Sequence, residues 1–188
     1  MGFLVRLFLA LVIAVIIGAA SAWLSLDSVA ESSFAANGAW RISPDSRDSK
    51  LGLYERAALA RANLLAPDSR DSLDLIAFRD EAGAPLDGSC TYRIEGSGLP
   101  ARAWSLAAYS ATWWPSAPQG YAMTDREAAN ADGSYVIYAS AKAKPDHWLA
   151  LNGARKFALA LTLYGPQTNA VAAPSSFNAP RIIKETCK

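Results

Sequence analysis

Residues 157–166 read FALALTLYGP, and this stretch decides the fold class. Every second residue at its start is bulky and apolar: Phe157, Leu159, Leu161 and Leu163. A period of two is typical of a β-strand that buries one face, whereas a helix repeats its apolar residues every three or four positions. Gly165 and Pro166 close the run with turn residues. We therefore expect a strand here.

The same alternation recurs in other segments of similar length: residues 73–78, 90–95, 102–110 and 134–140. Clusters of turn residues separate these segments, at residues 80–83, 85–88 and 130–133. Shorter strands are expected at 40–42 and, along a sheet edge, at 181–184. Short strands joined by turns are typical of an antiparallel sandwich rather than of alternating strands and helices.

One soluble helix is expected between the first two strands. Leu51, Tyr54 and Ala58 recur at three- and four-residue steps, and Pro67 ends the pattern. The hexapeptide PDSRDS occurs on both sides of this helix, at 44–49 and 67–72, and its residues favour helix boundaries and turns. The predicted fold is mainly β: a jelly-roll-like antiparallel β-sandwich with one flanking α-helix, preceded by an N-terminal transmembrane helix.

The transmembrane helix is predicted from residues 7–26, LFLALVIAVIIGAASAWLSL, which carry no charge. A helix of this length rises roughly 30 Å, the thickness of a bilayer's hydrocarbon core. Arg6 precedes the segment and Asp27 follows it, which favours a cytoplasmic N-terminus. We expect a single-pass protein of the inner (cytoplasmic) membrane with its C-terminal domain in the periplasm. The expected parts are an anchor or signal segment (1–26), a linker (27–39) and a β-sandwich domain (40–188).

A cleaved signal peptide is the alternative interpretation of the same segment. Its apolar region would be residues 7–17, and Ala20-Ser21-Ala22 fits the small-x-small cleavage pattern. The retained anchor is favoured because Leu24 and Leu26 continue the apolar run past that point. Both interpretations export the domain.

The sequence contains two cysteines, Cys90 in a predicted strand and Cys187 next to the C-terminus. An even number of cysteines in an exported chain favours a disulfide, so we predict a Cys90–Cys187 bond. Closing a loop of this size contributes roughly 4 to 5 kcal/mol in the chain-entropy model. Two cysteines and one histidine at these spacings form no zinc motif, and we expect neither a metal nor another cofactor.

Charge and motifs exclude several functional classes. Lysine and arginine number 18 and aspartate and glutamate 17, a net charge of +1 with no basic block, so we expect no nucleic-acid partner. The chain has one histidine, His147, and no G-x-S-x-G nucleophile motif. A carbohydrate-active or related hydrolase using Asp132, Asp146 or His147 is the alternative hypothesis. It requires two such groups within about 10 Å of each other.

Aromatic residues are unusually dense in the second half of the chain, and they favour a binding or structural module over an enzyme. Trp113 and Trp114 are adjacent in a loop-like stretch, where both indoles cannot point into one core. Exposed aromatic rings can stack on sugars or receive a partner chain. We expect binding through Trp113, Trp114, Trp148 and Arg102, close to His147, with a partner protein of the envelope or a glycan as the ligand.

A series of short motifs spread over residues 38–185 resembles the family known as domain of unknown function 1214, in its short, membrane-anchored, single-domain form. The motifs are Gly38-Ala39-Trp40, Tyr54-Glu55-Arg56-Ala57, Pro85-Leu86-Asp87-Gly88, Leu99-Pro100-Ala101-Arg102-Ala103-Trp104, Asp132-Gly133-Ser134, His147-Trp148-Leu149 and 157–166. The resemblance implies a β-sandwich and an exported setting. It implies no mechanism, and His147 stands where members of the family often have asparagine.

Overall fold

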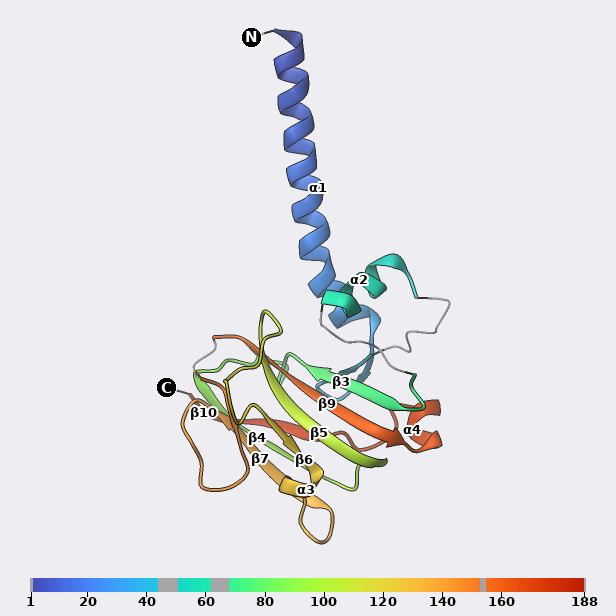
Figure 1. The fold of residues 1–188 in the computed structure, drawn as a ribbon, viewed down its shortest axis with the longest axis vertical. Coiled ribbons are helices and arrows are strands. Elements are labelled where there is room, and N and C mark those ends of the chain that lie inside the picture. The colour runs from blue at the N-terminus through green and yellow to red at the C-terminus, as the bar shows by residue number, and fades with distance from the viewer. Residues whose placement is uncertain (1, 44–50, 62–67, 153–154, 188) are drawn as a thin grey trace.

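The computed structural model describes residues 2–43, 51–61, 68–152 and 155–187. Two sheets face each other, and a long helix, α1 (Phe3–Ser33), projects from one end of the sandwich (Figure 1). The six-stranded sheet has the order β1 (Ala35–Asn37), β2 (Trp40–Ile42), β3 (Ser72–Ala77), β9 (Phe157–Pro166), β5 (Ala101–Ser110) and β6 (Ala122–Thr124). The four-stranded sheet has the order β10 (Arg181–Cys187), β4 (Cys90–Ser97), β7 (Ser134–Ser140) and β8 (Trp148–Ala150).

The predicted mainly β sandwich is confirmed, and its core follows from the alternation in the sequence. Side chains of one parity from each sheet meet between the layers and are buried. The six-stranded sheet contributes Trp40, Ile42, Leu73, Leu75, Ala77, Trp104, Leu106, Ala108, Phe157, Leu159, Leu161 and Leu163. The four-stranded sheet contributes Cys90, Tyr92, Ile94, Tyr135, Ile137, Ala139, Leu149 and Ile182. In the predicted strands, the alternating apolar side chains therefore point into the core.

One strand pair departs from the antiparallel prediction, because β8 runs parallel to β7. The backbone N–H of Tyr138 donates to the His147 carbonyl at 2.8 Å, and that of Leu151 donates to the Ser140 carbonyl at 3.1 Å. A three-residue strand such as β8 is too short to show a period of two, and the same holds for β6. Two short helices, α3 (Asp125–Ala128) and α4 (Thr168–Ala172), were likewise not expected.

The N-terminal helix is longer than the sequence led us to expect. Its apolar part, Phe3–Ser25, has a mean hydropathy of 2.7 and is not buried against the rest of the chain, so it could serve as a membrane anchor or a signal sequence. We expected residues 27–39 to form a linker, but α1 continues to Ser33 and β1 begins at Ala35. Residues 26–33 contain no glycine or proline that would end a helix, which explains the continuation.

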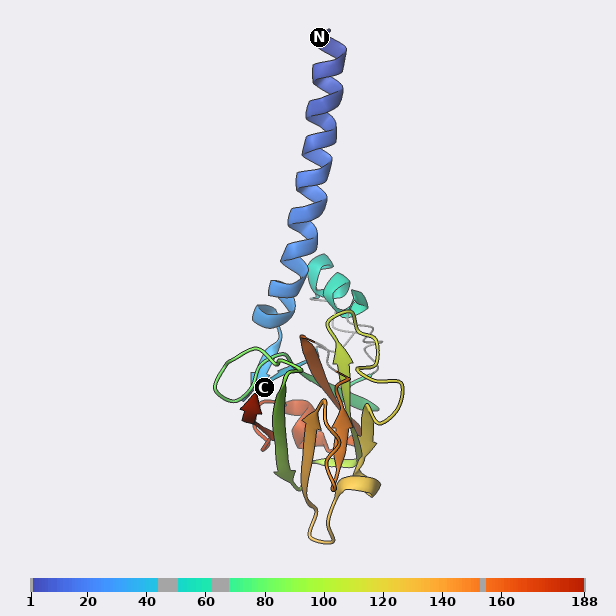
Figure 2. The ribbon, with the colours of Figure 1, turned by 90° about the vertical axis from the view of Figure 1, so that its left-hand side faces the viewer.

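Helix α2 (Leu53–Arg61) confirms the predicted soluble helix in part and packs beside the C-terminal part of α1 (Figure 2). Leu59 is buried, whereas Tyr54, which we placed on the apolar stripe, is more than half exposed. Pro67 and the first hexapeptide repeat lie outside the described residues. In the second repeat, Arg70 pairs with Asp68 in a turn that leads into β3, as expected for a boundary segment.

The predicted disulfide between Cys90 and Cys187 is present. The two residues are direct partners in the β4–β10 register, so the bond joins two adjacent strands. Strand β10 forms one edge of its sheet and ends the described chain. The disulfide therefore fixes the C-terminal strand to the core.

Candidate functional site

The side of the six-stranded sheet that faces away from the core, here called the outer face, is organised in rows set by the strand register. A polar row crosses four strands and consists of Asp74, Thr162, Ser105 and Thr124. The next row consists of Ile76, Ala160, Ala107 and Ala122. Beyond it, Tyr109 pairs with Ala158, and Phe78 follows the end of β3. This second row, here called the floor, is apolar and lies between the polar row and the aromatic rings, and its members Ile76 and Ala107 are buried.

Asp74 is the charged residue of the polar row. Thr162 Oγ1 donates a 2.7 Å hydrogen bond to Asp74 Oδ1. Burial raises the pKa of Asp74 above its usual value of 3.8, and the hydrogen bond from Thr162 opposes this shift. A partly desolvated carboxyl group on the outer face of a sheet is a candidate for a binding or catalytic position.

Further hydroxyl groups lie on the strands near Asp74. Ser105 Oγ lies 3.3 Å from the Tyr164 hydroxyl, and these two residues together with Thr162 belong to adjacent strands β5 and β9. The pKa of Tyr109 is raised by burial and also by the nearby Tyr121, Tyr164 and Asp74, which places these groups within electrostatic reach of one another. The polar row therefore offers several hydrogen-bond donors and acceptors beside one carboxyl group.

Aromatic rings border the floor on its other side; this aromatic cluster consists of Phe78, Tyr109, Trp113 and Tyr121. The Trp113 ring centroid lies 6.0 Å from that of Phe78, edge-on, and 6.0 Å from that of Tyr109. Tyr121 lies 6.1 Å from Tyr109. Trp113 has a φ of 61°, in the left-handed region, where a bulky residue is strained. Such strain at a half-buried tryptophan in a surface loop is common at ligand-binding positions.

The raised pKa of Asp74 gives a prediction for stability. A carboxyl group whose pKa is higher in the folded than in the unfolded chain stabilises the fold below the unfolded pKa, and this contribution is lost as pH rises through the folded pKa. Asparagine does not titrate, so the stability of Asp74→Asn relative to the wild type should increase as pH rises above about 3.8. Urea unfolding of both proteins between pH 3 and pH 7 measures this difference.

Asp132→Asn is the matched control, because its stability relative to the wild type should change with pH in the opposite direction. Hydrogen bonds from Ser134 lower the pKa of Asp132, so the wild type gains stability as this carboxyl group ionises. The stability of Asp132→Asn relative to the wild type should therefore fall as pH rises toward 3.8. A pH-independent difference for Asp74→Asn would contradict the placement of Asp74 in a desolvated site.

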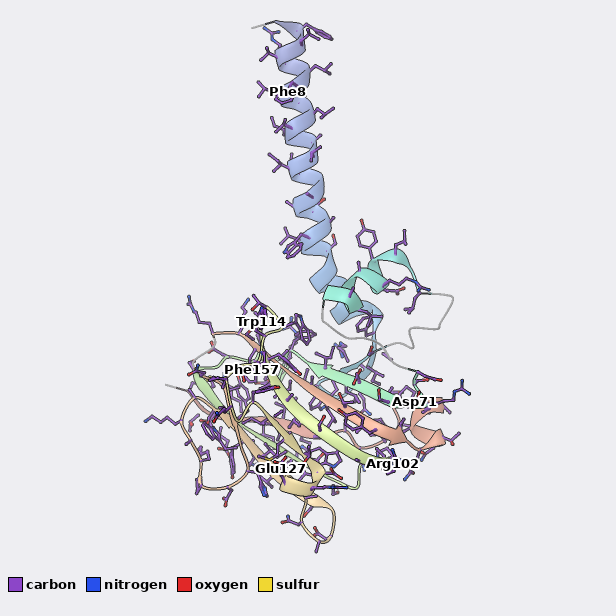
Figure 3. The ribbon with its side chains drawn as sticks, viewed as in Figure 1. Phe8, Asp71, Arg102, Trp114, Glu127 and Phe157 are labelled. Atoms are coloured by element: carbon purple, nitrogen blue, oxygen red, sulfur yellow. A yellow bond between two sulfur atoms is a disulfide. The ribbon has the colours of Figure 1, made fainter. Side chains whose placement is uncertain are left out.

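The structure separates the residues that we expected to bind together. Trp113 belongs to the aromatic cluster, whereas the neighbouring Trp114 points outward and is 74% exposed. Arg102 lies at the opposite end of β5 from these tryptophans, beside Gly165 (Figure 3). Trp148 belongs to β8 of the four-stranded sheet, where its Nε1 donates to the Ser140 carbonyl at 3.0 Å. These four residues do not form one surface.

The hydrolase candidates each have separate partners. Asp132 Oδ1 accepts hydrogen bonds from the Ser134 backbone N–H at 2.9 Å and the Ser134 hydroxyl at 2.7 Å, in a solvent-exposed turn. His147 Nδ1 lies 3.3 Å from the Val136 carbonyl. Asp146 is exposed. Among the residues that the structure describes, no hydrogen bond or ion pair joins any two of these three side chains.

Sequence reasoning missed Asp74, Ser105, Thr162 and Tyr164. An aspartate within the otherwise apolar stretch SLDLIA (72–77) was the available signal for Asp74. The other three residues occupy ordinary outward positions of their strands and become significant only when the register aligns them. A second missed signal is Thr124-Asp125-Arg126-Glu127, a capping box that begins α3, in which the Thr124 N–H donates to Glu127 Oε2 at 2.8 Å.

A family model described as "Protein of unknown function (DUF1214)" matches residues 71–168, just over half of the chain. The match contains all residues of the polar row and the aromatic cluster. No curated protein matches the sequence. The chain resembles the crystal structure of the VPA0106 protein from Vibrio parahaemolyticus, with a TM-score of 0.60 and 20% identity over 90% of this chain and 44% of that one.

A crystal structure of an uncharacterised protein from Burkholderia cenocepacia aligns with a TM-score of 0.46 and 17% identity, over 88% of this chain and 39% of that one. The chain thus spans less than half the length of both structures. The first likeness supports the β-sandwich fold, and at these identities the comparison extends to the fold alone.

Proposed function

This chain belongs to the DUF1214 family, whose function is unknown, and from its own residues we propose that it is a membrane-anchored module of the periplasm that binds a glycan of the cell envelope on its outer face. Three features support the location. Phe3–Ser25 is long and apolar enough to cross a bilayer, and Arg6 precedes the uncharged segment whereas acidic residues follow it. The Cys90–Cys187 bond suits an oxidising compartment.

The single observation that carries the proposed ligand is the arrangement of the outer face. A sugar ring has an apolar face of C–H groups and a rim of hydroxyl groups. The half-buried aromatic cluster matches the first, and the polar row around Asp74 matches the second. The net charge of +1 and the absence of a basic block agree with a neutral or weakly charged ligand.

Glycan binding by paired tryptophan variants tests this function. Full-length protein in detergent micelles is titrated with soluble muramyl glycan fragments and with a neutral O-chain oligosaccharide of lipopolysaccharide, and binding is followed by isothermal calorimetry. Trp113→Ala should raise Kd about tenfold, as expected when a central tryptophan contact is removed. Asp74→Asn should weaken binding to a similar degree, roughly tenfold, because a hydrogen bond to a charged group is replaced by one to a neutral amide.

Trp114→Ala is the matched control, since it removes the same side chain one residue away, outside the aromatic cluster. Its affinity should equal that of the wild type. Circular dichroism and thermal unfolding establish that each variant is folded. An equal loss of glycan affinity in Trp113→Ala and Trp114→Ala would contradict the proposal. So would a wild type that binds neither glycan class.

A partner protein of the envelope is the alternative ligand for the same face. It would be indicated if cross-linking from Trp113 in cells captured a defined protein while neither glycan bound the purified chain. A hydrolase built on Asp132, Asp146 and His147 is the weaker proposal, because in the described part of the chain Asp132 and His147 each bond to β7, at Ser134 and Val136, and not to each other.

A further inference from the structure

The end of the sandwich nearest α1 carries exposed apolar side chains that the proposed glycan site does not use. Leu53 is 86% exposed and Tyr54 is 56% exposed, both in the first turn of α2. Trp114 is 74% exposed in the loop that follows β5. Large apolar side chains of this exposure on one end of a domain indicate an interaction surface.

These three residues lie on the same end of the molecule. Figures 1 and 2 show α2 beside the C-terminal part of α1, above the sandwich. Figure 3 shows Trp114 at the end of the sandwich that faces α1 and α2, away from Arg102 and Glu127. We call Leu53, Tyr54 and Trp114, together with the basic residues described next, the membrane-proximal surface.

Two exposed basic residues adjoin the tryptophan loop. Arg155 and Lys156 line a shallow, open depression together with Asp87 and the segment 110–112, which runs directly into Trp113 and Trp114. Hydrogen bonds with Ser89 are the main cause of the lowered pKa of Asp87. Arg155 and Lys184 both lie close enough to this carboxyl group to lower its pKa further. Cations thus outnumber carboxylates at this place, which gives it a positive charge.

The length of α1 brings α2, the part of this surface that packs beside the helix, to the level of lipid headgroups. The apolar span ends at Ser25 and the helix continues to Ser33, a further rise of about 12 Å at 1.5 Å per residue. The headgroup layer on each side of the hydrocarbon core is roughly 5 to 8 Å thick. Helix α2, which packs beside this continuation, therefore lies next to that layer when α1 spans the bilayer.

We propose that the membrane-proximal surface docks on the headgroup layer of an anionic phospholipid bilayer, the same bilayer that holds α1. Tryptophan and tyrosine favour this layer because one end of each ring is apolar and the other is polar, and Arg155 and Lys156 complement anionic lipid. The inference rests on the membrane anchoring that is part of the proposed function. It adds a second attachment, through which the bilayer also contacts the sandwich itself.

Depth-dependent quenching in vesicles tests the docking. Full-length variants with one added cysteine, Leu53→Cys or Trp114→Cys, carry an environment-sensitive fluorophore and keep the native disulfide. They are reconstituted in phosphatidylcholine vesicles containing phosphatidylglycerol and a lipid with a nitroxide on its headgroup. Ala131→Cys, in the turn after α3 at the far end of the sandwich, is the control for the domain (Figure 1). Leu11→Cys with a nitroxide in the acyl chain is the control for α1.

Labels at positions 53 and 114 should be blue-shifted and quenched, whereas the label at position 131 should not. In the Arg155→Gln/Lys156→Gln background, the docked-to-undocked ratio at position 114 should fall about fivefold for each charge removed. Quenching at position 11 with no quenching at position 114 overturns the docking and leaves the anchor intact. No quenching at position 11 overturns both the anchor and the docking.

Discussion

Cys187→Ser should lower the free energy of unfolding by about 4 kcal/mol, because the disulfide closes a loop with a sequence separation of 97 and its removal frees the unfolded chain. The edge strand β10 also loses its covalent link to β4, while Ile182, which is fully buried, depends on that strand for its position. For a chain of this size, a loss of this order lowers Tm by roughly 10 °C. Thermal unfolding followed by near-ultraviolet circular dichroism measures the shift.

A reductant provides the control for this prediction. Treating the wild type with dithiothreitol should reproduce the Tm of Cys187→Ser, and adding dithiothreitol to the variant should change nothing further. Cys90→Ser should match Cys187→Ser, apart from the small difference caused by placing a hydroxyl group at the buried Cys90 position. Equal Tm values for the oxidised wild type and both variants would show that the bond contributes nothing to folding stability.

Trp40→Ala should be the most destabilising substitution of a single core side chain, by about 3 to 5 kcal/mol. Trp40 is fully buried where β2 pairs with β3, and its Nε1 donates a 2.7 Å hydrogen bond to the Pro180 carbonyl, just before β10. Alanine leaves a large cavity and an unpaired buried carbonyl group, and both effects add to the loss. Urea unfolding followed by far-ultraviolet circular dichroism gives the free-energy difference.

Two variants separate the causes of this loss. Trp40→Phe keeps most of the ring volume but removes the N–H donor. It should lower the free energy of unfolding by about 1 to 3 kcal/mol, less than Trp40→Ala does. Trp114→Ala removes an exposed tryptophan and should change stability by less than about 0.5 kcal/mol. If Trp40→Ala and Trp114→Ala were equally destabilised, Trp40 would not hold the place in the core that the structure gives it.

Most of the sandwich was predictable because its longer strands bury one face and so alternate in sequence. Residues 157–163 and 102–110 show this most clearly, and they form β9 and β5, two adjacent inner strands of the six-stranded sheet. The parallel strand β8 was not predictable. Its three residues are too few for a periodic pattern, and its direction follows from the loop after β7 rather than from its own composition.

The candidate site was much less predictable than the fold. Asp74 and Thr162 are 88 residues apart in sequence and meet only because β3 pairs with β9 in one register. A shift of that register by one residue would turn one of these two side chains toward the core. The aromatic residues were visible in the sequence, but their places depend on the tertiary structure: Trp113 packs in the loop after β5, whereas Trp148 belongs to β8.

The uninterrupted course of α1 from its apolar span to Ser33 has a geometric consequence for the orientation of the sandwich. A helix transmits rotation, so each residue added or removed between Ser25 and Ser33 turns the domain by about 100° around the helix axis and moves it by about 1.5 Å. A flexible linker would instead allow the sandwich to adopt any orientation about the axis of α1. Here the orientation of the outer face relative to α1 depends on the number of residues in the helix.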